Sequence, residues 1–121
     1  MHIEDEACMK TVEIKKNGDT IARAWHATGY FARLRGLLGR TIEQNGGMLL
    51  SPCSAIHTIG MGYAIDALYL DKNLRVLRID DSIQPGKIMP QQRGGRHVLE
   101  LPAGSAKQHS LSVGDTLEVI R

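Results

Sequence analysis

The sequence predicts a mainly β protein, a compact antiparallel sandwich or barrel with one short α-helix near residues 29–39. Several short segments alternate polar and apolar side chains or are rich in β-branched residues, and turn-forming residues separate them. Only one segment has apolar residues at helical spacing. We expect residues 11–121 to form a single domain, preceded by a flexible N-terminal segment at residues 1–10.

The first two strands are expected to form a hairpin, followed by the helix. Residues 11–15 alternate in polarity, and Asn17-Gly18 supplies two residues that tolerate positive φ before the returning segment 19–27. Helical spacing begins after Thr28. Because glycine weakens a helix and often follows its last turn, the helix is expected to end near Gly39.

Strands are also expected on both sides of a long loop in the second half of the chain. The segment CSAIHTIGMGYAIDALYLD, residues 53–71, predicts two strands joined at residues 60–62, and residues 74–80 return as a hairpin partner. The stretch from Asp80 to Gly95 has little periodicity and is rich in proline and glycine, so it is expected to be a loop. Two further strands are expected within residues 97–104 and 116–120.

Composition and charge argue against several classes of protein. The net charge of +2, with one Trp, three Tyr and one Phe, is weak support for binding nucleic acid. No segment approaches the roughly 20 apolar residues that span a bilayer. The start lacks the pattern of a signal peptide, and Cys8 and Cys53 are read as free thiols. We expect a cytoplasmic monomer or weak dimer that neither binds nucleic acid nor inserts into membranes.

The central segment contains three residues of the kind that bind soft metal ions such as copper. Cys53, His57 and Met61 lie four residues apart, and copper favours thiol, imidazole and thioether ligands. In a strand, however, successive members would lie roughly 13 Å apart, too far to share an ion or to act as a thiol and its base. No metal and no cofactor are therefore expected.

His57 and Asp66 are the candidate acid–base residues. His57 is read either as a core histidine satisfied by a hydrogen bond or as an acid or base that lines a pocket. Asp66 has apolar neighbours on both faces of its strand, so its carboxylate needs a partner. That partner is an arginine, a backbone turn or His57.

Basic residues suggest a second kind of site. Loop residues such as Lys87 and helix residues such as Arg33 belong to a set that either gathers around an anion or forms a solvated surface. The residues expected to bind a ligand, if the protein has a pocket, are Arg35, Arg40, His57, Met61, Asp66, Arg93 and Arg96.

Several runs together resemble one family. RLRGLLGR, GGMLLSPCSAIHTIGMGYAIDALYLD, HVLELPAG and VGD resemble, over roughly residues 20–120, the bacterial and archaeal family called domain of unknown function 192. The resemblance implies a compact β domain of jelly-roll or barrel-like form, and it implies no biochemical role. Many family members carry a secretion signal. Tyr63-Ala64 departs from the family pattern, where a Phe-Pro or Ile-Pro pair is usual. The matching residues are Met61, Asp66, Leu70, Asp71, Leu99, Glu100, Gly104, Gly114 and Asp115.

Three functional hypotheses remain open. The first, which we favour, is a non-enzymatic binding module in which the bend at residues 60–62, the loop from Asp80 to Gly95 and the arginines near Gly36 form a concave surface. Its ligand would be a small anion or a segment of a partner protein. The second is a hydrolase or lyase with a His57/Asp66 acid–base pair. The third is a protein-interaction domain that uses a sheet edge.

Overall fold

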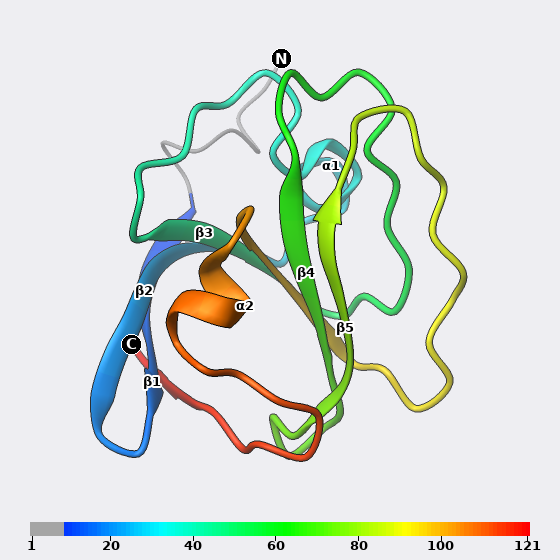
Figure 1. Ribbon diagram of the computed structural model, residues 1–121. Helices are drawn as coiled ribbons and strands as arrows, with labels where there is room; N and C mark the ends of the chain where they lie inside the picture. Colours follow the sequence, from blue (N-terminus) through cyan, green and yellow to red (C-terminus); the bar gives the residue numbers. More distant parts are fainter. Residues whose placement is uncertain (1–8) are drawn as a thin grey trace.

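The computed structural model describes residues 9–121. Residues 1–8, which include Cys8 and most of the segment expected to be flexible, lie outside the described residues. The mainly β prediction is confirmed by seven strands and two short helices within the described chain (Figure 1). These elements are β1 (Lys10–Lys16), β2 (Asp19–Ala27), α1 (Tyr30–Arg35), β3 (Gly46–Leu50), β4 (Ile65–Leu70), β5 (Val76–Ile83), β6 (His97–Pro102), α2 (Ser105–Gln108) and β7 (Glu118–Ile120).

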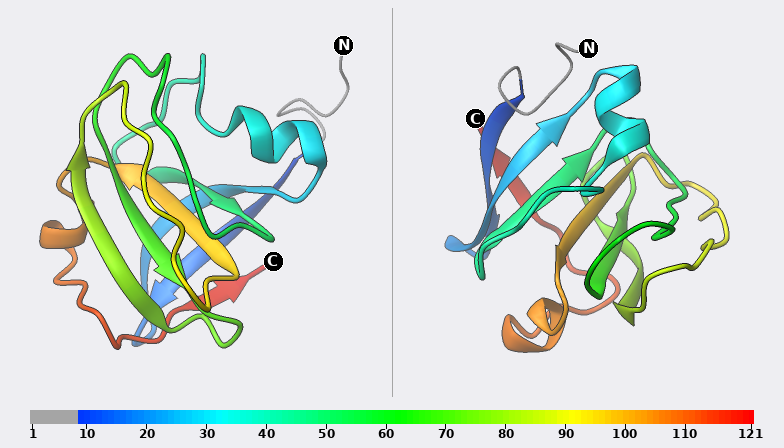
Figure 2. Two further views of the ribbon diagram at one scale, coloured as in Figure 1. Left: turned by 90° about the vertical axis from the view of Figure 1, so that its right-hand side faces the viewer. Right: turned by 90° about the horizontal axis from the view of Figure 1, so that it is seen from above.

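The strands form one curled sheet with the order β5-β4-β6-β3-β2-β1-β7. The curl gives the sheet the form of a half-barrel, with α1 and α2 on opposite sides of the molecule (Figure 2). All strand pairs are antiparallel except β2 and β3, which are parallel. The fully antiparallel expectation is wrong at this pair. Parallel neighbours need a crossover connection, and residues 28–45, which contain α1, provide it.

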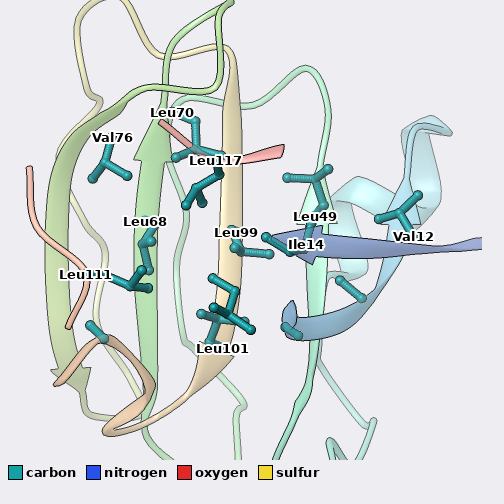
Figure 3. Close-up of a cluster of buried hydrophobic side chains, with 14 residues drawn as sticks. Val12, Ile14, Leu49, Leu68, Leu70, Val76, Leu99, Leu101, Leu111 and Leu117 are labelled. Carbon is teal, nitrogen blue, oxygen red and sulfur yellow. The ribbon is translucent and has the colours of Figure 1, made fainter. Parts of the chain in front are cut away.

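Both faces of the sheet are buried. The inner face carries a cluster of aliphatic residues that α2 and the chain after it help to enclose (Figure 3). The outer face is covered by α1 and by the segments 51–64 and 84–96. The outer cluster consists of Ala27, Ala32, Leu37, Met48, Leu50, Ile56, Ile65, Ala67, Tyr69, Ile83 and Val98.

Segment 51–64 is not the strand that its β-branched residues predict. It contains only an isolated bridge between His57 and Ile88. Backbone hydrogen bonds join it to segment 84–96 instead, including Met89 N to Ile56 O at 3.0 Å and Cys53 N to Arg96 O at 2.8 Å. The two segments therefore form a connected layer over the outer face of the sheet.

Thr58 anchors this layer. Its side chain is fully buried, and its hydroxyl donates to Gln84 O at 2.7 Å and accepts from Lys87 N at 2.9 Å. The hydrogen bonds of Thr58 fix the course of the chain on either side of His57. The loop expected from Asp80 begins later, because β5 continues to Ile83.

Helix α1 is shorter than its apolar spacing predicts. It ends at Arg35, because Gly36 adopts a φ of 54° and donates its N–H to Ala32 O. This conformation is open to glycine at little cost. Among the described residues, no helix is long and apolar enough to cross a membrane.

Candidate pocket on the outer face of the sheet

A pocket of about 140 Å³ opens between α1 and segment 51–64. The end of α1 and the following turn form one wall, and the segment from Cys53 to Met61 forms the other. The floor is provided by β3 and β6. The lining residues are Arg33, Arg35, Gly36, Leu37, Leu38, Leu50, Cys53, Ala55, Ile56, His57, Ile59, Met61 and Glu100.

Strand register places Glu100 on the pocket floor. Leu99 and Leu101 of β6 belong to the inner cluster, so Glu100 between them faces outward, opposite Met48 of β3. The turn after α1 lies directly above it. A Cβ atom built on Gly36 would stand 3.4 Å from Glu100 Oε1, so the backbone of Gly36 covers the carboxyl group closely.

The Glu100 carboxyl group is buried in an apolar environment. The residue is 4 % exposed, and Oε1 is a buried oxygen without a hydrogen-bond partner in the structure. Burial raises the pKa of this carboxyl from 4.5 to about 8, because removal from water disfavours the charged form. At neutral pH Glu100 is therefore mainly a neutral acid, with one O–H donor.

Cys53 lies in the pocket wall as a thiol. Burial raises the pKa of Cys53, and the neighbouring Glu100 raises it further, against the opposing effects of a hydrogen bond to Ala55 O and the charge of Arg33. Its Sγ donates to Ala55 O at 3.1 Å. Because the thiolate is the nucleophilic form, Cys53 is poorly suited to covalent catalysis at neutral pH.

Two arginines bring positive charge to the pocket. Arg33 donates from Nε to Thr28 O at 3.2 Å and from Nη1 to Pro52 O at 3.1 Å. Arg35 donates from Nε to Leu38 O at 2.9 Å. These bonds hold both guanidinium groups against the backbone of the pocket wall.

Three of the seven expected ligand-binding residues line this pocket, namely Arg35, His57 and Met61. His57 is exposed at the mouth, and its Nδ1 accepts a hydrogen bond from Ile59 N at 3.3 Å. The other four are elsewhere: Arg40 is buried with its guanidinium 5.7 Å from the Trp25 ring centre, Arg93 and Arg96 are exposed in segment 84–96, and Asp66 is fully buried in β4.

Asp66 binds backbone, not His57. Its Oδ1 accepts from Ser82 N at 2.8 Å and its Oδ2 accepts from Ala106 N at 2.9 Å. The partner that its burial requires is therefore the chain at the end of β5 and in α2. The structure does not bring Asp66 and His57 together as an acid–base pair, since Asp66 is absent from the lining of the pocket that His57 borders.

Cys53, His57 and Met61 all line the one pocket, although an extended strand would separate them. The segment turns instead of extending, with Gly60 at a φ of 86°. Within residues 9–121, no group of three or more His, Cys, Asp or Glu side chains has an arrangement that could hold a metal ion.

Sequence reasoning missed Glu100 as a site residue. Its signals were its place among the residues that match the family pattern and its position in the segment HVLELP, where the flanking leucines face a core. Such a pattern usually places the charged residue on the solvated face of an antiparallel sheet. Its burial depends on α1 and the segment 51–64, which lie far away in the sequence.

A second polar cluster joins β2, the end of β3 and β6. Ser51 Oγ lies 3.0 Å from His26 Nε2 and 2.6 Å from His97 Nδ1, and Arg121 Nη1 lies 2.8 Å from His26 Nδ1. Arginine is only a donor, so His26 Nδ1 accepts and His26 Nε2 carries the proton. His26 then donates to Ser51, and the Ser51 hydroxyl donates to His97 Nδ1. The chain of hydrogen bonds requires both imidazoles to be neutral.

Acidification is expected to destabilise the protein through this cluster. Burial lowers the pKa of His26 and of His97 below 6.5, so the unfolded chain takes up protons that the folded chain resists. The contribution of this cluster to the free energy of unfolding should therefore fall as the pH drops below 6.5. Urea unfolding at pH 7.5 and 5.5 in a Glu100→Gln background, which removes the opposing pH dependence of Glu100, measures this fall. The fall should be smaller when His26→Gln is added and should stay the same when His109→Gln is added. An equal fall in all three proteins would contradict the prediction.

The fold defines a small β protein built on one curled sheet, with a pocket of about 140 Å³ on its outer face. The chain belongs to the family named domain of unknown function 192, described as an uncharacterized ACR, whose model matches residues 11–119. Among curated proteins, none matches this sequence.

Two solved structures have the same fold. One is a protein of unknown function from Novosphingobium aromaticivorans DSM 12444, 20% identical, with a TM-score of 0.78 over 91% of this chain and 84% of that chain. The other comes from Sinorhizobium meliloti 1021, and its name proposes a transcription regulator. It is 24% identical, with a TM-score of 0.79 over 93% of this chain and 94% of that chain. At these identities the likeness concerns the fold alone.

Proposed function

We propose that the protein is a non-enzymatic binding module whose pocket on the outer face takes a small anionic ligand. The observation that carries the proposal is the Glu100 carboxyl group on the pocket floor. Buried polar atoms nearly always have a hydrogen-bond partner, yet Glu100 Oε1 has none in the structure. A ligand atom in the pocket would supply that partner.

The charge of the pocket favours an anion. Arg33 and Arg35 each bring one positive charge, and Glu100 brings none at neutral pH because burial raises its pKa to about 8. The charge among the lining residues is therefore positive at neutral pH, carried by Arg33 and Arg35. An anion entering it gains electrostatic energy that a cation would lose.

A segment of a partner protein is the second candidate ligand. Leu38 and Ile59 line the pocket and are 38% and 50% exposed, and Ile88, which pairs with His57, is 76% exposed. Apolar side chains of this size gathered at one place on a surface are typical of a contact region. An apolar side chain of a partner would fit the same mouth.

Neither alternative hypothesis has comparable support. The proposed acid–base pair lacks its carboxylate, since both oxygens of Asp66 accept backbone hydrogen bonds. For the sheet-edge hypothesis, β7 spans only three residues, and the start of β5 hydrogen-bonds to the chain just before β7, with Val76 N donating to Asp115 O at 2.8 Å. The short β7 and the covered start of β5 leave only the later part of β5 as an edge for pairing.

A screen of small molecules by ¹H–¹⁵N NMR tests the proposal. Anionic and neutral compounds are added singly to the protein, together with short apolar peptides. We expect binders to shift the amide signals of Gly36, Leu37 and Ile56 and to leave the Trp25 indole signal in place. Binders that shift only Trp25, or the absence of any shift from the whole panel, would contradict the proposal.

A further inference from the structure

We propose that the ligand is an aliphatic monocarboxylate whose carboxylate accepts a hydrogen bond from Glu100 on the pocket floor, while its hydrocarbon chain lies along the apolar walls toward the mouth. The inference rests on the proposed function and specifies its ligand class. The inference is based on one observation. A buried acid group, an apolar wall and two guanidinium groups lie in the same pocket.

The floor favours a carboxylate over a neutral head group. A protonated Glu100 offers one O–H donor, and a hydrogen bond from a carboxylic acid to a carboxylate is about twice as strong as one between neutral groups. The carboxylate would lie in an apolar environment, where such a bond is worth more than in water. Arg33 and Arg35 line the same pocket and carry the opposite charge to the ligand's carboxylate.

The walls favour an aliphatic chain. Leu37, Leu50 and Ile56 are buried side chains of the lining, and no aromatic side chain stands among the described lining residues to stack on a ring. Leu38 and Ile59 continue the apolar surface to the mouth, where both are partly exposed. A chain too long for the 140 Å³ pocket could therefore extend over these two residues.

The groups around Glu100 determine how binding depends on pH. From segment 51–64, Cys53 and Tyr63 are close enough for the charge of Glu100 to affect them, and burial raises the pKa of each, so both are mainly neutral up to pH 9. The strands beside β6 contribute Met48 opposite Glu100 on one side and Ala67 on the other, which carry no charge. Among the described residues, the other charged or titratable neighbours in this region are Arg33, Arg35, Arg40 and His57.

An amine is the main competing ligand class. It would require Glu100 to lose its proton and would place a third positive charge beside Arg33 and Arg35. The two classes have opposite pH signatures. Binding of a carboxylate requires the proton on Glu100 and weakens above pH 8, whereas binding of an amine releases that proton and strengthens up to pH 8.

Titration with sodium hexanoate and with hexylamine, followed by NMR between pH 6.5 and 9.5, tests the inference. We expect hexanoate to bind, with affinity that falls about tenfold per pH unit well above pH 8. Glu100→Gln should retain binding, since its amide donates, and should abolish the fall. Glu100→Leu should lose binding at least tenfold. Glu43→Gln, an exposed residue outside this pocket, is the matched control and should behave as wild type.

The outcomes separate this inference from the proposed function. Binding of hexylamine but not hexanoate would overturn the carboxylate assignment and leave the binding module intact. Hexanoate binding without pH dependence in the wild-type protein, or unaffected by Glu100→Leu, would also overturn it. Failure of every compound in the wider panel to shift the pocket signals would overturn both.

Discussion

Replacing Asp66 by asparagine is expected to lower the free energy of unfolding by about 2–4 kcal/mol, without changing the ligand pocket. The carboxylate is fully buried and accepts one backbone N–H on each oxygen, from Ser82 and Ala106. Asparagine has only one acceptor oxygen, and its NH₂ group would face the other N–H donor. One buried donor is then left unsatisfied.

The position of Asp66 explains why the effect should be large. Its strand, β4, lies between β5 and β6 in the sheet, and the register with β5 shifts between Ile65 and Ala67. Ser82, on the facing part of β5, has a φ of 51°, which is unusual for a residue other than glycine. Asp66 therefore fixes an irregular part of the sheet and, through Ala106, the short helix α2.

Urea unfolding of the wild-type protein and Asp66→Asn at pH 7 measures this effect. Asp81→Asn is a suitable control, because Asp81 lies on β5 and is exposed. We expect the control to differ from wild type by less than about 0.5 kcal/mol. A loss below about 1 kcal/mol for Asp66→Asn would mean that the two hydrogen bonds contribute far less than buried charge-assisted bonds normally do.

The parts of the fold that sequence predicts best are those fixed by neighbouring residues. The hairpin of β1 and β2 has its turn at Asn17 and Gly18, with φ values of 52° and 84°, as the dipeptide predicts. Alternation of polarity along residues 11–15 agrees with the pairing. The burial of Asp66 is also predicted by its neighbours in the sequence, because apolar residues on both faces of its strand indicate that its carboxylate needs a partner.

The parts that sequence reasoning missed depend on distant segments. Residues 53–59 have the β-branched content of a strand, but their backbone partners lie in segment 84–96, which arranges them as a turning layer. No local pattern specifies that pairing. The same layer, with α1, covers Glu100 and turns an apparently solvated glutamate into a buried acid.

Replacing Glu100 by glutamine is expected to raise the free energy of unfolding by on the order of 3 kcal/mol at pH 7. The pKa of this carboxyl is about 8 in the folded protein and 4.5 as its ordinary value, so above pH 4.5 folding must take up a proton. In the wild-type protein, the contribution of Glu100 to the free energy of unfolding is therefore greatest below pH 4.5 and falls as the pH rises to 8. Glutamine does not titrate and avoids that loss.

Unfolding of both proteins by urea at pH 5, 7 and 8.5 measures the gain, which should increase from pH 5 to 8.5. A constant difference across this range would mean that Glu100 is not protonated on folding. Suppose that Glu100→Gln is more stable than the wild-type protein and that Glu100→Leu loses hexanoate binding. The wild-type glutamate then destabilises the folded protein and is needed to bind the ligand. Groups that destabilise a protein persist where function requires them, so this combination would identify the pocket as the working part of the molecule.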